Sequence, residues 1–190
     1  MKGGAIMLTA SKILKEMDKG NIEIDPFNID NLNPNSYNVS LRNTLKVYDK
    51  NCVLQTDMEN PVRTIEIPKN GIILEPGTLY IGATNERIFS DKFIPAIDGR
   101  SSIGRLGINI HATAGFGDIG FNGTFTLEIF VLQRVLVKPD ILIGQVYFEE
   151  PCGDIDFLYN GRYQNQIDPT ESRLHMVESQ LNERYHYKNK

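Results

Sequence analysis

Residues 125–148 read FTLEIFVLQRVLVKPDILIGQVYF, a stretch dominated by apolar, β-branched and aromatic residues. Such residues are typical of strands, and the KPD in the middle is typical of a turn. Because side chains alternate along a strand, Leu127 and Ile129 fall on one face and Glu128 on the other. The stretch therefore predicts consecutive short strands with one carboxylate opposite the core face. The strand-like runs are Phe125–Leu132, Arg134–Val137 and Gln145–Phe148.

Similar short runs recur upstream, separated by turn signals such as KNG and EPG. Many short strands with regular turns favour an all-β barrel or sandwich. These runs lie at residues 21–27, 36–41, 64–67 and 79–82.

The clearest helix signal covers Thr9–Gly20, where Ile13, Leu14 and Met17 share one face. After about Asp156 the chain becomes polar and rich in turn residues, and Ser172–Arg184 has a partial apolar stripe that predicts a short helix. A length of 190 residues favours a single domain.

The composition is that of an ordinary globular protein, with 41% hydrophobic residues and a net charge of -4. This charge argues against a general nucleic-acid or anionic-membrane partner, although a local basic pocket could hold a phosphate. No apolar run approaches the roughly 18 residues of a membrane span. The start, MKGGAIMLTA, does not resemble a signal peptide, so we expect a cytoplasmic protein.

The cysteines, Cys52 and Cys152, are far apart in the chain, and a cytosolic setting predicts free thiols. Zinc-dependent nucleobase deaminases carry H-x-E and P-C-x-x-C elements. Here no second cysteine follows Cys152 at that spacing, and His111 is followed by Ala-Thr. We therefore expect no zinc site.

Arginine and hydroxyl side chains crowd together in RSSIGR at Arg100–Arg105. Guanidinium groups bind phosphate oxygens bidentately, and a helical turn starting at Ser101 would add backbone N–H donors. The alternative is a capped turn whose arginines pair with surface carboxylates. The residues by themselves leave both interpretations open.

The glutamate inside the apolar run has two interpretations as well. Glu128 shares its face with Thr124 and Thr126, and that face either meets solvent or closes a pocket. His111 in a strand-like run is most simply structural, and Asp118 between glycines is most simply a turn former.

In combination, these residues resemble the dCTP deaminase branch of the dCTP deaminase/dUTPase superfamily. The resemblance covers roughly residues 7–175, and the order of its motifs makes it specific. The motifs are PNSYNVSL at Pro34–Leu41, GRSSIGRLGI at Gly99–Ile108, HATAGFGDIGFNG at His111–Gly123, TLEIF at Thr126–Phe130 and YNGRYQNQ at Tyr159–Gln166.

The resemblance implies a mainly β fold, a dUTPase-like distorted β-barrel of jelly-roll type with a short N-terminal helix. It implies one such domain over residues 1–190, in which 1–6 are an extension and 157–190 form a mobile tail that closes over the active site. It further implies a homotrimer with active sites between subunits.

The implied reaction is the hydrolytic deamination of dCTP to dUTP and ammonia, with Mg²⁺ on the phosphates and no zinc. By resemblance, Glu128 is the general acid/base, while Ser101 and Arg105 place the water and the pyrimidine. The resemblance also implies dTTP as an inhibitor. The implied substrate-binding residues are Arg100 and Ser102 for the triphosphate, the backbone at Ala112 and Ile119 for the base, Asp118 and Phe121 for the sugar, and Tyr159, Arg162 and Gln166 in the tail.

This chain departs from the family pattern in several places, among them Asn38 for the usual Asp, Arg42 for a common glycine and Arg162 for the usual lysine. Three activities stay open: a deaminase that releases dUTP, a bifunctional enzyme that continues to dUMP and pyrophosphate, and a plain dUTPase. Glu128 in TLEIF, together with the Arg105-Leu-Gly-Ile segment, favours deamination over a plain dUTPase, and the deaminase that releases dUTP is our main interpretation. The Thr113-Ala-Gly115 turn resembles bifunctional members. A non-catalytic nucleotide-binding homologue is a further alternative.

Overall fold

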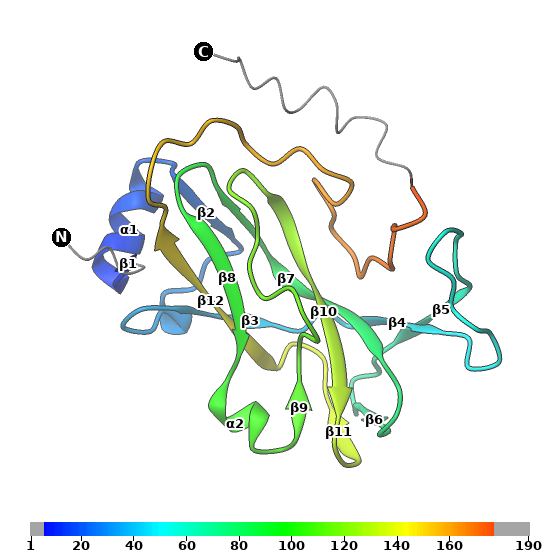
Figure 1. Ribbon diagram of the computed structural model, residues 1–190. Helices are drawn as coiled ribbons and strands as arrows, with labels where there is room; N and C mark the ends of the chain where they lie inside the picture. The colour runs from blue at the N-terminus through cyan, green and yellow to red at the C-terminus, as the bar shows by residue number, and fades with distance from the viewer. Residues whose placement is uncertain (1–5, 177–190) are drawn as a thin grey trace.

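The structure, a computed structural model, describes residues 6–176 and is built mainly from antiparallel strands. Two sheets carry most of the strands, and a two-stranded ribbon lies beside them (Figure 1). The mainly β prediction is therefore confirmed.

The smaller of the two sheets is organised around β12. This strand pairs with β8 along one edge and with β3 and β1 along the other, always antiparallel. The members are β1 (Ile6–Met7), β3 (Tyr37–Ser40), β8 (Ile94–Gly99) and β12 (Leu142–Glu150).

The larger sheet has the order β5-β4-β7-β10-β9, and β2 pairs with the far end of β7. Its members are β2 (Ile22–Asp25), β4 (Thr44–Tyr48), β5 (Val62–Glu66), β7 (Tyr80–Ser90), β9 (Ile108–Asn109) and β10 (Asn122–Val131). The remaining elements are the ribbon of β6 (Ile72–Leu74) and β11 (Val135–Val137), the helices α1 (Ala10–Asp18) and α2 (Ser101–Gly104), and the 3₁₀ turn η1 (Ile29–Asn31).

The alternation predicted for the TLEIF strand is present in β10. Leu127 and Ile129 are completely buried in the core, and Val146 and Phe148 of β12 belong to the same cluster. Glu128 therefore projects from the opposite face of β10, as the two-residue period requires.

The predicted N-terminal helix is α1, which buries Ile13 completely. Thr9 occupies the N-cap position, although its side chain makes no capping hydrogen bond. Gly20 follows the helix with a φ of 76°, a left-handed conformation that glycine adopts without strain.

The chain after β12 returns across β10 and β4 without forming a helix or strand (Figure 1, orange). Its backbone is tied to the start of β10: Tyr159 N–H donates to the Ile119 carbonyl at 2.7 Å, and Thr124 N–H donates to the Gln166 carbonyl at 2.9 Å. We call residues 157–176 the tail. The mobility expected of this tail stays a prediction.

Predictions for the two ends of the chain are tested only in part. Residues 172–176 are not helical, and the rest of the expected Ser172–Arg184 helix lies outside the described residues. Residues 1–5 of the expected extension also lie outside, whereas Ile6 pairs with Glu150 in β1.

Within residues 6–176, no helix has the length and apolar character needed to cross a membrane. Cys52 and Cys152 are both free and exposed, as predicted.

Candidate active site

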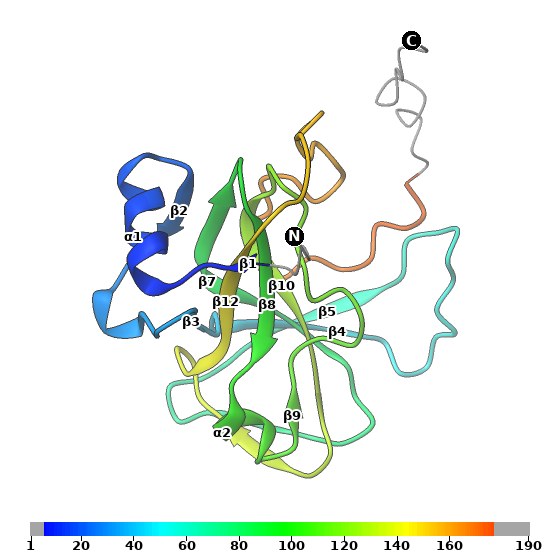
Figure 2. The same ribbon diagram turned by 60° about the vertical axis from the view of Figure 1, so that its left-hand side comes forward.

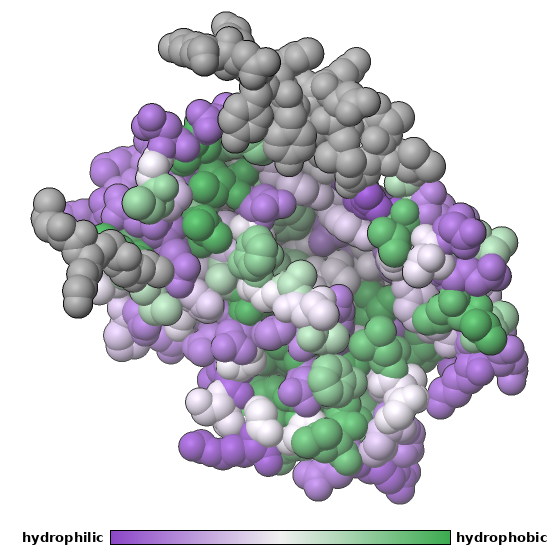
Figure 3. Space-filling model, viewed as in Figure 1, coloured by the Kyte–Doolittle hydropathy of each residue, from purple (hydrophilic) through white to green (hydrophobic). Residues whose placement is uncertain are grey.

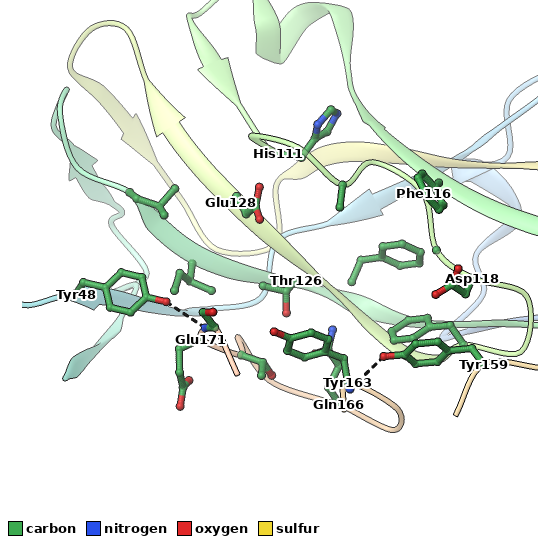
Figure 4. Close-up of a pocket in the computed structure, with 18 residues that line it drawn as sticks. Tyr48, His111, Phe116, Asp118, Thr126, Glu128, Tyr159, Tyr163, Gln166 and Glu171 are labelled. Atoms are coloured by element: carbon green, nitrogen blue, oxygen red, sulfur yellow. Dashed lines mark hydrogen bonds between the residues drawn. The ribbon is translucent and has the colours of Figure 1, made fainter. Parts of the chain in front are cut away.

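A cavity of about 500 Å³ lies between β10 and the tail. Glu128 and Thr126 face it from β10, and Tyr159, Tyr163 and Gln166 face it from the tail (Figure 4). Tail residues thus form part of the cavity wall, and closure of the tail over an active site stays a prediction.

Glu128 is half-buried, and its position is fixed by the loop that follows β9. The backbone N–H of Ala112 donates to Oε2 at 2.7 Å, and that of Thr113 donates to the same oxygen at 3.3 Å. Within the described chain, Oε1 receives no hydrogen bond from the protein. One carboxylate oxygen is thus anchored, and the other is available to a ligand or water in the cavity.

His111 stands at the edge of the cavity close to Glu128 (Figure 4). Its Nε2 lies 3.5 Å from Oδ1 of Asp98, a residue of β8. The sequence predicts a purely structural role for His111, but in the structure its ring also forms part of the cavity wall.

The loop after His111 supplies both polar and aromatic wall residues. Asp118 is exposed and faces the cavity. Phe121 is nearly buried and packs edge-on against Phe125 with ring centroids 5.3 Å apart, while the Tyr159 ring lies 6.0 Å away. Aromatic rings grouped in this way form an apolar surface against which a sugar or base could pack.

The backbone groups predicted to recognise a base are partly occupied. The N–H of Ala112 is used by Glu128, and the carbonyl of Ile119 is used by Tyr159. Neither residue lines the cavity, so their recognition of a base stays a prediction.

The predicted tail residues do not all reach the cavity. Tyr159 and Gln166 do, and Gln166 Nε2 donates to the Thr124 carbonyl at 2.8 Å. Arg162 is not a wall residue; its guanidinium donates to the Arg173 carbonyl at 2.8 Å. Two wall oxygens, Thr126 Oγ1 and Gln166 Oε1, are buried and have no hydrogen-bond partner in the described chain.

Some wall residues were not singled out from the sequence. Thr170, Glu171 and Ser172 come from the tail, and Tyr48 comes from β4. No local motif marks them, because they reach the cavity only through the path of the folded tail.

The basic cluster lies away from this cavity. Ser101, Ser102 and Arg105 are exposed on or beside α2, and the Arg100 guanidinium donates to the Leu142 carbonyl at 2.9 Å. Figures 1 and 2 both place α2 at the end of the molecule opposite the tail. Within one chain these residues therefore do not lie beside Glu128, and their place in an active site between subunits stays a prediction.

The reason for the separation is the direction of the chain after α2. Ile108 and Asn109 of β9 pair with Val131 and Phe130, at the end of β10 that follows Glu128. The chain then runs back along β10 before Ala112 meets Glu128. Gly107, which follows α2, accepts from the N–H of Leu132, so α2 lies beyond the Val131 end of β10, whereas Ala112 lies beside Glu128.

The cavity wall is acidic. It carries the carboxylates of Asp118, Glu128 and Glu171, and none of its described residues is a lysine or arginine. A polyanion would therefore need cations from elsewhere in order to bind here.

The fold and the cavity define a β-barrel protein of the dUTPase-like kind, with an acidic, aromatic-lined site partly closed by its own tail. A structure of 2'-deoxycytidine 5'-triphosphate deaminase from Agrobacterium tumefaciens shares this fold, with a TM-score of 0.61 at 16% identity; the match covers 77% of this chain and 49% of that one.

Comparison of sequences is more specific. The family described as dCTP deaminase-like matches residues 7–151, and the chain belongs to this family. Proteins named "dCTP deaminase, dUMP-forming" are 49% identical in Clostridium beijerinckii, over 84% of this chain and 91% of the relative, and 47% identical in Hathewaya histolytica, over 88% and 97%. One of the same name in Leptospira biflexa is 44% identical over 84% and 90%.

Proposed function

We propose that the chain is a dUMP-forming dCTP deaminase, which converts dCTP and two waters into dUMP, ammonia and pyrophosphate. The observation that carries the proposal is the anchored carboxylate of Glu128 at the wall of the cavity. The sequence by itself favours release of dUTP, whereas the names of the relatives favour the reaction that continues to dUMP.

In the first step, Glu128 takes a proton from a water that attacks C4 of the cytosine ring. It then passes a proton to the departing amino group, which leaves as ammonia. One carboxylate can serve both transfers if it is held in place beside the reacting atoms. The hydrogen bond from Ala112 N–H to Oε2 provides that support, and Oε1 is left to meet the water.

In the second step, a further water attacks the α-phosphate of dUTP and displaces pyrophosphate. Asp118 is the candidate to orient this water, since its carboxylate faces the cavity from a short turn (Figure 4). Phe121 is the candidate for the surface against which the deoxyribose packs, where a 2'-hydroxyl would be disfavoured.

The triphosphate requires positive charge that the cavity wall lacks. We propose that α2 of a second copy completes the site: Arg100 brings positive charge to the triphosphate and Ser102 a hydroxyl, while Ser101 and Arg105 place the water and the pyrimidine. Mg²⁺ arrives on the substrate phosphates, as this cation prefers. Apolar side chains exposed near the α2 end support a contact there: Leu106, Leu132 and Leu136 are 48%, 75% and 57% exposed. Figure 3 shows apolar surface gathered at this lower end. A closed ring of subunits, such as the trimer that the family resemblance implies, would complete every site.

The test is to incubate the protein with dCTP and Mg²⁺, and separately with dUTP and Mg²⁺, and to resolve all products. We expect ammonia, dUMP and pyrophosphate in equal amounts from dCTP. Accumulation of dUTP without pyrophosphate would show that the protein is a deaminase that releases dUTP. Pyrophosphate from dUTP without ammonia from dCTP would identify a dUTPase, and binding without turnover a non-catalytic homologue.

A further inference from the structure

The tail segment from Ile167 to Arg173 lies along β4 and is held by side chains of that strand and of the residue leading into it. Arg42 Nη1 donates to the Ile167 carbonyl at 2.7 Å, and Tyr48 Oη accepts from the Ser172 N–H at 3.0 Å. Between these contacts, Lys46 Nζ forms an ion pair with the Glu171 carboxylate. Residues 42–48 thus contact the tail segment at three points along its length.

The Lys46–Glu171 pair is the most sheltered of these contacts. Each side chain is 23% exposed, whereas Asp168, which lies 3.4 Å from the Arg42 guanidinium, is 72% exposed. Burial alone would raise the pKa of Glu171, but the hydrogen bond from Lys46, together with a backbone hydrogen bond and the charges of Lys46 and Arg173, outweighs it, so the pKa is lowered. Since exposed ion pairs contribute little to stability, the sheltered pair is expected to dominate the attachment.

The pair also bears on the charge of the cavity. Glu171 is a wall residue, and so are its neighbours Thr170 and Ser172. Lys46 offsets a carboxylate that would otherwise repel an anionic ligand, and it fixes the segment that carries the neighbouring wall residues. Loss of Lys46 would therefore leave the negative charge of Glu171 uncompensated, and it would release the segment that carries Thr170 and Ser172.

We propose that Lys46 is a positioning residue: its ion pair with Glu171 holds the tail over the cavity before any nucleotide binds. The inference deepens the proposed function and rests on it only for its kinetic consequence. The pair prepares the nucleotide site and takes no part in the proton transfers, so its loss should raise KM for dCTP far more than it lowers kcat.

The experiment is a charge-reversal cycle of Lys46→Glu, Glu171→Lys and the double variant in the full chain. Hydrogen exchange of the protein without nucleotide reports on the Ser172 N–H, and KM and kcat report on the reaction. We expect each single variant to lose protection in residues 167–173 and to raise KM about tenfold, the scale of a partly buried ion pair. The double variant should recover both, while kcat stays within about threefold throughout.

Matched reversals of Glu23 and Arg87, an ion pair at 3.3 Å between β2 and β7, are the control and should leave exchange of the tail unchanged. Lys46→Met and Glu171→Gln replace any reversal that fails to fold, and both should also expose the segment. Retained protection in the single variants, or a double variant as exposed as they are, would overturn the proposal. Because exchange is measured without substrate, it can support the ion-pair role even if no ammonia is released from dCTP; release of ammonia with unchanged exchange would refute that role alone.

Discussion

Oε2 of Glu128 lies 2.7 Å from the backbone nitrogen of Ala112, 16 positions earlier in the chain. The contact joins the middle of β10 to the loop that leaves β9, so the orientation of the carboxylate depends on backbone rather than on another side chain. Because the donor is a backbone N–H, any substitution of Ala112 other than proline keeps it, so a test of the proposed catalytic role must change Glu128 itself.

Replacing this carboxylate by an amide tests that role directly. Glu128→Gln keeps an acceptor for the Ala112 N–H, so the melting temperature should stay close to that of the parent. Ammonia release from dCTP should fall by about 10²–10⁴-fold, the range of general acid–base catalysis. A folded variant that deaminates dCTP at the parental rate would refute the assignment.

The separation of α2 from the cavity leads to a prediction about mixed assemblies. Arg105→Ala and Glu128→Gln should each be inactive as pure proteins. When the two variants are co-expressed, some cavities would combine an intact Glu128 with an intact α2 from the neighbour. Random mixing should restore about a quarter of the parental activity.

The measurement is ammonia release by the co-purified mixture, with each variant alone as the control. If each site belonged to one chain, mixing would restore nothing. An unchanged baseline in a mixture shown by mass spectrometry to contain both variants in one assembly would therefore contradict the shared site.

Much of the fold follows from local pattern. The two-residue period of β10 predicts which side chains enter the core, and the spacing of Ile13 and Met17 predicts α1. Strand β8 was missed, because Pro95 breaks the pattern of a strand. In the structure β8 pairs in the sheet only with β12, so the missing N–H of the proline costs little there.

Site residues could be predicted from the sequence only where they lie in a recognisable motif. Glu128, Asp118 and Phe121 do line one cavity, but Arg100–Arg105 do not. Adjacency in sequence does not show which side chains lie beside Glu128 and which lie beyond the end of β10; the pairing of β9 with β10 decides this. Glu171 could not be predicted either, since its role arises from the tertiary path of the tail across β4.

The close approach of Gly123 to the tail gives another prediction. A Cβ at this position would lie 2.8 Å from the carbonyl oxygen and 3.2 Å from the nitrogen of Gln166, so Gly123→Ala should displace that part of the tail. We expect the Thr124–Gln166 backbone hydrogen bond to be lost, with faster exchange of residues 163–168 and a raised KM for dCTP.

Hydrogen exchange of the free protein is the appropriate measurement. Gly99→Ala is the control, because a Cβ there meets nothing within 4 Å, and it should leave exchange of residues 163–168 unchanged. Unaltered exchange in Gly123→Ala would show that the strand, rather than the tail, accommodates the methyl group.

A buried carboxylate away from the cavity predicts how stability depends on pH. Glu86 is 4% exposed, and its oxygens accept from Ser40 N–H at 2.8 Å and from Ser40 Oγ at 2.9 Å. Burial raises the pKa of Glu86 despite these bonds, and the nearby charge of Asp140 adds to the effect. The folded state therefore binds more protons than the unfolded state, and its stability falls as pH rises above the ordinary glutamate pKa.

Glu86→Gln should remove this loss, since the amide can accept from Ser40 N–H and donate to Ser40 Oγ without a buried charge. We expect the melting temperature of the variant to fall less between pH 5 and 8 than that of the parent. The contrasting control is Glu16→Gln: the bonds from Lys19, Asn21 and Lys12 lower the pKa of Glu16 to about 2, so its contribution is present above the unfolded pKa and is lost as pH falls below it. Parallel melting curves for Glu86→Gln and the parent across this range would contradict a buried charge at Glu86.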